Sequence, residues 1–160
     1  MRQLLEVYES IGPLTEAKDD FGRLLKMAWV KAANAANRRL REMEKAGPAY
    51  NVIDQTGGRR RVVGQLLGGI GFAWIQLSGR NREFINKFNK LSKGDRVWSF
   101  PGGRVYLSKV SRGYHLSFFD LIRGAEDQLM SPKEEGFQAA LQYLQKAGYI
   151  KDAYVDSRLD

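Results

Sequence analysis

Apolar residues recur every three or four positions between residues 15 and 46, which is the spacing of one face of an α-helix. Thr15 comes shortly before several acidic residues, and a hydroxyl followed by negative charge is typical of a helix N-terminus. Gly47 and Pro48 end the pattern, because proline cannot donate the backbone hydrogen bond that would extend the helix. The sequence therefore predicts a long N-terminal helix over residues 15–46, with the apolar stripe Leu14, Phe21, Leu25, Ala28, Ala32, Ala35, Leu40 and Met43.

A second amphipathic pattern, near the C-terminus, predicts a helix over residues 132–147. Ser131 and Glu134 have the spacing of a capping box, and Pro132 occupies the first helical position, where its missing N–H is not needed. Gly148 is the expected stop. Shorter helices are predicted over residues 2–10, from 78 to 93 and over 114–123.

Residues 96–110 alternate between apolar and polar side chains around the turn sequence Pro-Gly-Gly, a pattern typical of a β-hairpin. The two-residue period of a strand places Trp98 and Phe100 on one face. Tyr106, on the partner strand, is expected to join them there.

The periodicity of residues 62–77 leaves two structures open. Gly64 and Gly68 lie four positions apart, which suits a closely packed helix, whereas the valine and isoleucine content suits a pair of buried strands. We favour a helix. The segment before it, residues 49–61, is predicted to be a loop, and residues 152–160 are predicted to be a polar tail.

Together these elements predict one α+β domain over residues 1–160 that is mostly helical, with a long N-terminal helix, a central hairpin and a capped C-terminal helix. The length is that of a single ordinary domain. Hydrophobic residues make up 43% and charged residues 28%, which is typical of a globular chain rather than a disordered one. The chain has no cysteine, which excludes disulfides, thiolate metal sites and cysteine nucleophiles.

Membrane contact is not expected. The most apolar run, residues 62–77, is too short to cross a bilayer comfortably and contains Gln65 and Gln76. Glu6 and Glu9 interrupt the apolar region that a signal peptide would need. These features and the lack of cysteine favour a cytoplasmic location.

The positive charge is concentrated in the middle of the chain. The whole sequence carries a net charge of +8, whereas residues 38–112 alone hold 16 basic and five acidic residues, a net charge of +11. Such a field attracts polyanions and accelerates their encounter with the protein. The alternative is a basic surface that only aids solubility.

Nucleic acid is the polyanion that this pattern favours. Arginine forks match phosphate oxygens, glycines such as Gly57 and Gly58 let a backbone approach them, and aromatic rings stack on bases. Each feature has a structural alternative, since Arg38 and Arg39 also suit a helix C-terminus and Trp98 could cover a core. The candidate nucleic-acid-binding residues are Arg38, Arg39, Arg59, Arg60, Arg61, Arg80, Lys87, Lys90, Arg96, Trp98 and Arg104.

The sequence contains few candidate catalytic residues. His115 is the single histidine, and no second histidine or cysteine supports it, so we interpret it as structural. The glycine-arginine run at residues 57–61 lacks the Gly-Lys-Ser/Thr end of a phosphate-binding Walker loop. We therefore predict a non-enzymatic protein with no cofactor and no metal; the alternative is a small enzyme that acts on nucleic acid.

Residues 31–50 read KAANAANRRLREMEKAGPAY, and this segment resembles one found in small uncharacterised proteins of tailed bacteriophages. The resemblance implies a phage or mobile-element origin, hence a place in the host cytoplasm or in a virion, and it assigns no functional residue. The predicted function is a nucleic-acid-binding accessory protein. The alternative is a virion subunit or an inhibitor that acts through protein–protein contacts or as a homo-oligomer, because the alanine-rich centre of the long helix suits close packing.

Overall fold

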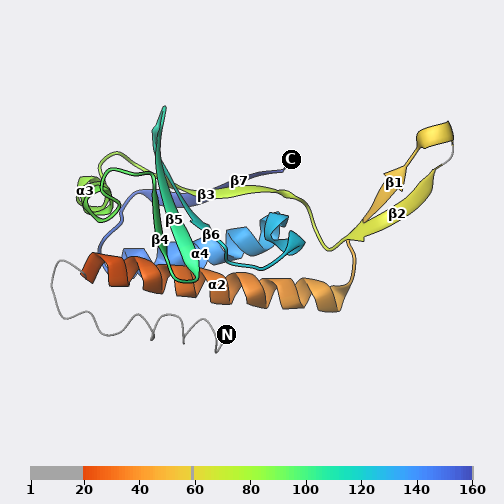
Figure 1. Cartoon of the computed structure of the whole chain (residues 1–160), viewed down its shortest axis with the longest axis horizontal. Coiled ribbons are helices and arrows are strands. Elements are labelled where there is room, and N and C mark those ends of the chain that lie inside the picture. The colour runs from red at the N-terminus through yellow and green to blue at the C-terminus, as the bar shows by residue number, and fades with distance from the viewer. Residues whose placement is uncertain (1–19, 59, 160) are drawn as a thin grey trace.

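The computed structural model describes residues 20–58 and 60–159 of the chain. Two long helices, α2 (Asp20–Ala46) and α4 (Met130–Lys146), lie side by side beneath a five-stranded antiparallel sheet (Figure 1). A shorter helix, α3 (Arg82–Leu91), lies at one end of this body. At the other end a two-stranded arm of β1 (Tyr50–Asp54) and β2 (Arg61–Leu66) projects beyond α2.

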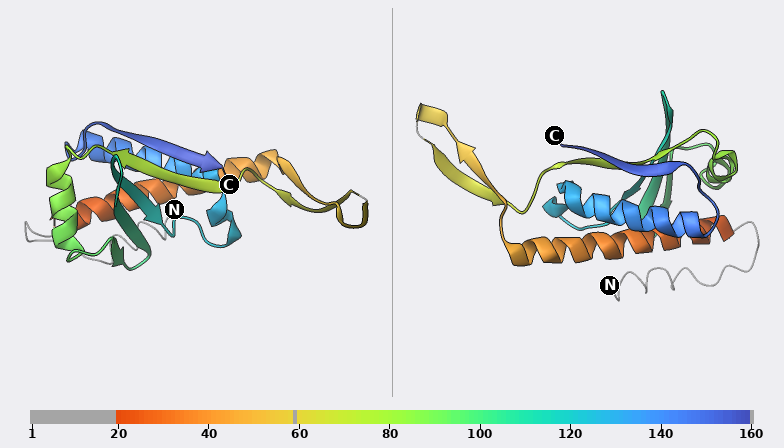
Figure 2. Two further views of the ribbon diagram at one scale, coloured as in Figure 1. Left: turned by 90° about the horizontal axis from the view of Figure 1, so that it is seen from above. Right: turned by 180° about the vertical axis from the view of Figure 1, so that it is seen from behind.

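The sheet has the strand order β4-β5-β6-β3-β7. Strand β3 pairs with β7 along its whole length, from Gly71 to Leu77, but with β6 only from Ile75 to Leu77. The first half of β3, before Ile75, therefore diverges from β6. Seen from above, β3 and β7 lie over the helices (Figure 2, left). The strands are β3 (Gly71–Leu77), β4 (Val97–Phe100), β5 (Gly103–Val110), β6 (Gly113–Phe119) and β7 (Ala153–Leu159).

The core lies between the sheet and the two long helices. Alternate residues of each strand point towards α2 and α4, because a strand places successive side chains on opposite faces. Phe118 of β6 meets Phe137 of α4 with ring centroids 5.7 Å apart. The buried side chains of the sheet include Ile75, Leu77, Val105, Leu107, Leu116 and Phe118, and those of the helices include Leu25, Ala28, Trp29, Ala32, Phe137, Leu141 and Leu144.

The two long helices approach closely because small residues line their contact. Ala32 and Ala36 of α2 are buried, and they face Gly136 of α4. A Cβ at position 136 would lie 2.7 Å from the backbone oxygen of Ala32, closer than atoms can approach without a shift of the helix. The alanine-rich centre that the sequence offers for close packing is therefore used within the chain.

Gly136→Val should lower the free energy of unfolding by about 1–3 kcal/mol, the usual cost of overpacking a core. The added methyl groups would meet backbone of α2, which cannot rotate away as a side chain can. Urea denaturation measures the effect. Gln138→Val, at an exposed position of the same helix, controls for the helix propensity of valine and should cost well under 1 kcal/mol. Equal losses in the two variants would contradict the close approach.

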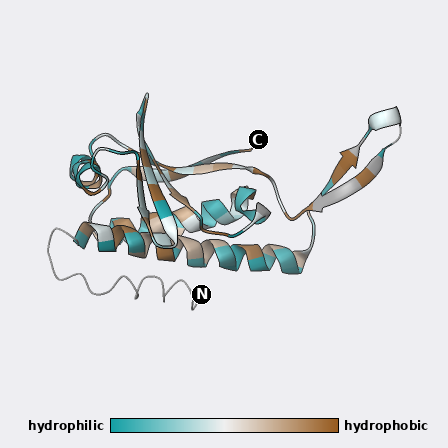
Figure 3. Ribbon diagram, viewed as in Figure 1, coloured by the Kyte–Doolittle hydropathy of each residue, from teal (hydrophilic) through white to brown (hydrophobic). Residues whose placement is uncertain are grey.

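The arm exposes apolar side chains on an isolated pair of strands. Tyr50 and Val62 are 56% and 55% exposed, and Val52 and Ile53 are exposed as well. A short helical turn, η2 (Thr56–Gly58), joins the strands. Figure 3 shows brown, hydrophobic segments on the strands of the arm, which points away from the body. Isolated hairpins are marginally stable in water, which makes the arm a candidate contact surface.

The α+β class is confirmed, but the chain is not clearly mostly helical as expected. Helices α2, α3 and α4 hold 54 of the 139 described residues, and strands β1 to β7 hold 44. Helix α2 ends at Ala46, directly before the predicted Gly-Pro stop, and its predicted start at residues 15–19 lies outside the described residues, as does the predicted helix over 2–10. The predicted hairpin corresponds to β4 and β5, which are two strands of the larger sheet.

Further expectations are corrected along the chain. Residues 62–77 form strands β2 and β3 rather than a helix, residues 114–123 contain most of strand β6, and the predicted polar tail is strand β7. The predicted loop over 49–61 contains strand β1. Strands β3, β6 and β7 pair with one another although they lie far apart in the sequence. These long-range hydrogen-bond ladders make the segments strands where local periodicity is also compatible with helix.

The predicted capping box is also wrong, although the helix itself is present. The structure begins α4 at Met130, and Leu129 at the N-cap makes no side-chain hydrogen bond. Ser131 Oγ instead accepts a hydrogen bond from Arg39 Nε at 2.9 Å, and Glu134 Oε2 accepts one from Ser157 Oγ at 2.8 Å. The side chains of Ser131 and Glu134, which a local cap would have used, therefore form tertiary contacts with α2 and β7.

Candidate nucleic-acid interface

The face of the sheet turned away from α2 and α4 carries a row of aromatic residues. Since Ile75, Leu116 and Val105 are buried towards the helices, their neighbours in each strand face the opposite way. Three rings are substantially exposed: Phe72 (51%), Phe119 (39%) and Tyr154 (58%). We call this surface the open face; it includes Phe72, Trp74, Arg104, Tyr106, His115, Phe119, Tyr154, Asp156 and Arg158.

Two aromatic pairs order the open face. The rings of Trp74 and His115 are stacked with centroids 4.9 Å apart and an interplanar angle of 27°. Those of Tyr106 and Phe119 meet edge to face at 6.0 Å. Burial lowers the pKa of His115, and the charge of Asp156 opposes the shift only in part, which favours the neutral imidazole in this stack.

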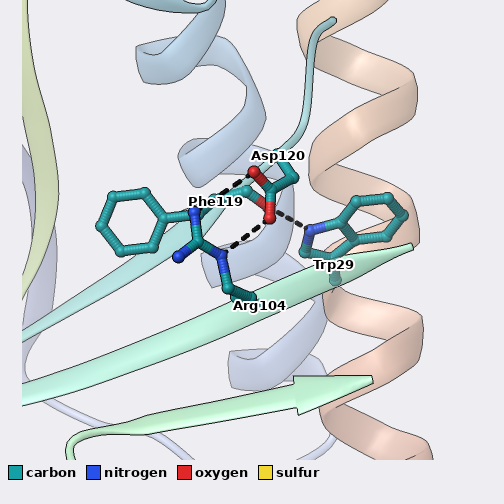
Figure 4. A network of polar contacts seen from close by, with 4 residues as sticks. All are labelled: Trp29, Arg104, Phe119 and Asp120. Atoms are coloured by element: carbon teal, nitrogen blue, oxygen red, sulfur yellow. Dashed lines mark hydrogen bonds and ion pairs between the residues drawn. The ribbon is translucent and has the colours of Figure 1, made fainter. Parts of the chain in front are cut away.

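Arg104 is fixed at the edge of the open face by an ion pair. Its Nε and second terminal nitrogen donate to the two carboxylate oxygens of Asp120 at 2.8 and 3.3 Å (Figure 4). That hydrogen bonding raises the pKa of Arg104, and the guanidinium lies 5.4 Å from the centroid of the Phe119 ring. The side chain remains half exposed, so its unused N–H groups can reach a ligand.

A hydrogen bond from helix α2 holds the backbone at the end of β6. Trp29 Nε1, on α2, donates a hydrogen bond to the backbone oxygen of Phe119 at 2.8 Å (Figure 4). The next residue, Asp120, has a φ of 66°, in the left-handed region that aspartate tolerates better than most residues. These constraints hold the Phe119 ring on the open face while the chain turns away from the sheet.

A cleft of roughly 300 Å³ opens where β3 and β6 diverge. Phe72 and Trp74 line one side and Phe119 the other. Asp127 and Lys133 also line the cleft, besides Phe118 and Phe137, and we call the part that these two residues form its charged end. Aromatic walls and a charged end give the cleft the lining that suits a flat polar ring.

A hydrogen bond to the backbone positions Lys133 at the charged end of the cleft. Lys133 Nζ donates to the backbone oxygen of Gly71 at 3.3 Å. Burial raises the pKa of Asp127, and the nearby Lys133 and a backbone hydrogen bond at Ile122 oppose the shift. Burial therefore outweighs these partners, and the charged form of the carboxylate is destabilised relative to water.

Of the predicted binding residues, Arg104 lies on the open face and Trp98 does not. Trp98 points to the helix side of β4, where its ring meets Phe100 at 5.2 Å and lies 5.7 Å from Lys26 Nζ. Val97, not Trp98, faces the same way as Tyr106, because Val97 and Tyr106 are register partners. The expectation that Tyr106 joins Trp98 and Phe100 on one face is therefore wrong.

The remaining predicted residues are dispersed. Lys87 forms an ion pair with Glu83 at 3.2 Å, and its Nζ lies 5.2 Å from the centroid of the Tyr149 ring. Arg39 donates a hydrogen bond to Ser131 and forms an ion pair with Glu42. Helix α3 and the arm lie at opposite ends of the molecule (Figure 1), so the basic side chains do not form one patch. Arg59 lies outside the described residues and Arg61 is the first residue of β2, whereas Arg38, Arg60, Arg80, Lys90 and Arg96 are exposed.

Sequence reasoning missed the centre of the open face. Phe72, Trp74 and Tyr154 were absent from the predicted site, because their segments were interpreted as a helix and a tail. The local signal was weak: Phe72, Trp74 and Gln76 recur with the two-residue period of a strand, but the residues between them are apolar too, so no clear alternation marks the strand.

Residues 20–58 and 60–159 contain no group of three or more histidine, cysteine, aspartate or glutamate side chains arranged to hold a metal ion. None of the helices in this part of the chain is long and apolar enough to cross a membrane. No protein-family model, curated protein or solved structure matches the sequence or the fold.

Proposed function

We propose that this protein binds single-stranded nucleic acid on the open face of its sheet and acts as a non-enzymatic accessory protein. One observation carries the proposal: Phe72, Phe119 and Tyr154 expose their rings on one face of an antiparallel sheet whose other face is covered by helices. Aromatic side chains presented in this way stack on unpaired bases, and each stacked base contributes about 1–3 kcal/mol.

The charge distribution supports the same ligand. The chain carries a net charge of +8, and two arginines flank the aromatic rings. Arg104 lies over Phe119, and Arg158 is the register partner of Phe72. A strand that stacks its bases on these rings would bring its phosphates within reach of both guanidinium groups.

Single strands are favoured over duplex because the contact is made with ring faces. In a duplex the bases are stacked on one another and offer only their edges, so an aromatic sheet cannot reach their faces. The resemblance of residues 31–50 to tailed-phage proteins supports a role in a phage or mobile element.

Fluorescence polarisation with labelled 12-nucleotide single strands and the matching duplexes, across a salt series, tests the proposal. We expect single-stranded DNA or RNA to bind at least tenfold more tightly than duplex, with an affinity that falls as salt rises. Equal affinity for duplex, or no binding at 50 mM salt, would contradict it.

The three consecutive arginines that follow Gly58 in the sequence are expected to add electrostatic affinity only. Replacing Arg59, Arg60 and Arg61 together by alanine should weaken binding of every sequence by a similar factor. The slope of log affinity against log salt should become shallower by about 0.7 for each phosphate of a single strand that the variant no longer neutralises. An unchanged slope would remove these arginines from the interface.

A protein-interaction role is the second candidate, and the arm is the observation that favours it. Tyr50 and Val62 are more than half exposed on strands that pack on each other alone. Exposed apolar strands of this kind often become buried in an assembly. Size-exclusion chromatography with light scattering in 1 M salt tests self-assembly: a defined oligomer supports this role, and a monomer opposes it.

A further inference from the structure

The cleft between β3 and β6 has the shape and chemistry of a pocket for one nucleobase. It opens onto the open face, and its walls are aromatic. Trp74, one of these walls, is stacked on His115 with ring centroids 4.9 Å apart. The charged end adds the ammonium of Lys133 and the carboxylate of Asp127.

We propose that this cleft takes up a single unstacked base of the bound strand and that Asp127 and Lys133 make guanine the preferred base. The inference rests on the proposed function, since the base enters as part of a strand that lies on the open face. It adds a sequence preference, which stacking on exposed rings alone does not provide.

Guanine is the base whose edge matches the carboxylate and the ammonium group at the charged end of the cleft. Its Watson–Crick edge presents two adjacent N–H donors, N1–H and the exocyclic amine, beside an oxygen acceptor. An ionised carboxylate is an acceptor only and can take both donors side by side, while an ammonium group donates to the oxygen. Adenine and cytosine each place a ring acceptor where guanine has N1–H, and thymine has no exocyclic amine.

The surroundings of Asp127 and Lys133 leave them able to make these bonds. Lys133 gives one of its three protons to the Gly71 oxygen, at 3.3 Å, which keeps two for a ligand. Asp127 is partly desolvated, and burial raises its pKa. Two N–H donors from a base would replace the water that burial has removed from the carboxylate.

Twelve-nucleotide oligothymidylates that carry one central guanine, adenine, cytosine or hypoxanthine test the inference by fluorescence polarisation. We expect the guanine oligomer to bind about tenfold more tightly than the all-thymine oligomer, within the range of a bidentate base contact. Hypoxanthine keeps N1–H but lacks the exocyclic amine, and it should lose most of that advantage.

Asp127→Asn removes the carboxylate, and in this variant the guanine and all-thymine oligomers should bind equally. Glu126→Gln is the matched control, because it makes the same change of charge at the adjacent, exposed residue and should keep the tenfold preference. If Asp127→Asn does not fold, the comparison of guanine with hypoxanthine on the unaltered protein decides the question.

The outcomes separate the two proposals. Tight binding of the all-thymine oligomer with no advantage for guanine would overturn the guanine pocket and leave the open-face proposal standing. A guanine preference that persists in Asp127→Asn would also overturn the assigned pocket. Binding of no oligomer would overturn the open-face proposal and the pocket together.

Discussion

Trp29→Ala is expected to lower the free energy of unfolding by about 3–5 kcal/mol, the range for removal of a large buried aromatic side chain. Trp29 is 1% exposed and meets Phe100 edge to face at 5.5 Å. A Cβ at Gly103 would clash with the indole of Trp29, which shows how closely β5 packs on this ring. Truncation would leave a cavity between α2 and the sheet that rigid strands cannot close.

The same substitution removes the hydrogen bond from Trp29 Nε1 to the backbone oxygen of Phe119. Trp29→Phe separates the two effects, because it keeps most of the ring and loses the donor; we expect a cost of about 1–3 kcal/mol. Trp98→Ala is the matched control, a half-buried tryptophan on the same side of the sheet, and should cost clearly less than Trp29→Ala. Urea denaturation measures all three, and equal losses at 29 and 98 would contradict the assigned role of Trp29.

The combined change Phe72→Ala and Phe119→Ala should weaken binding of single-stranded nucleic acid by about 2–6 kcal/mol, or at least roughly 30-fold. Each ring is exposed, so its loss removes a stacking surface for a base and little of the core. The melting temperature should therefore change by only a few degrees.

Phe72→Tyr with Phe119→Tyr is the control for that pair, because it keeps both rings and adds only hydroxyl groups. This variant should bind within about threefold of the unaltered protein. Fluorescence polarisation with one 12-nucleotide strand compares the three proteins. Undiminished binding by the double alanine variant, with the fold intact, would place the nucleic-acid site elsewhere on the molecule.

Local sequence determined the helices that carry a strong stop signal or a regular apolar face. The Gly-Pro pair at 47–48 ends α2, and the spacing of Phe137, Leu141 and Leu144 predicts the buried face of α4. The hairpin of β4 and β5 was also readable, because its turn and its alternation lie within 15 residues. In each case the deciding interactions lie within a few residues of one another along the chain.

The strands at the centre of the sheet could not be predicted in this way. Residues 71–77 pair with residues 153–159 and 114–116, and a single sequence does not show which segments will meet. The apolar run with glycines fits a helix and a strand equally well on local grounds, so the long-range ladder decides.

The same distinction applies to the candidate site. The sequence by itself determined a basic, aromatic chain without cysteine, with one histidine and with two strong helices. Only the tertiary structure decided that Trp98 faces the helices, that Phe72, Phe119 and Tyr154 share the opposite face, and that Asp127 and Lys133 meet in one cleft. The physical reason is that a strand alternates its side chains between two faces, and only the packing of the two helices against one of them determines which residues remain available to a ligand.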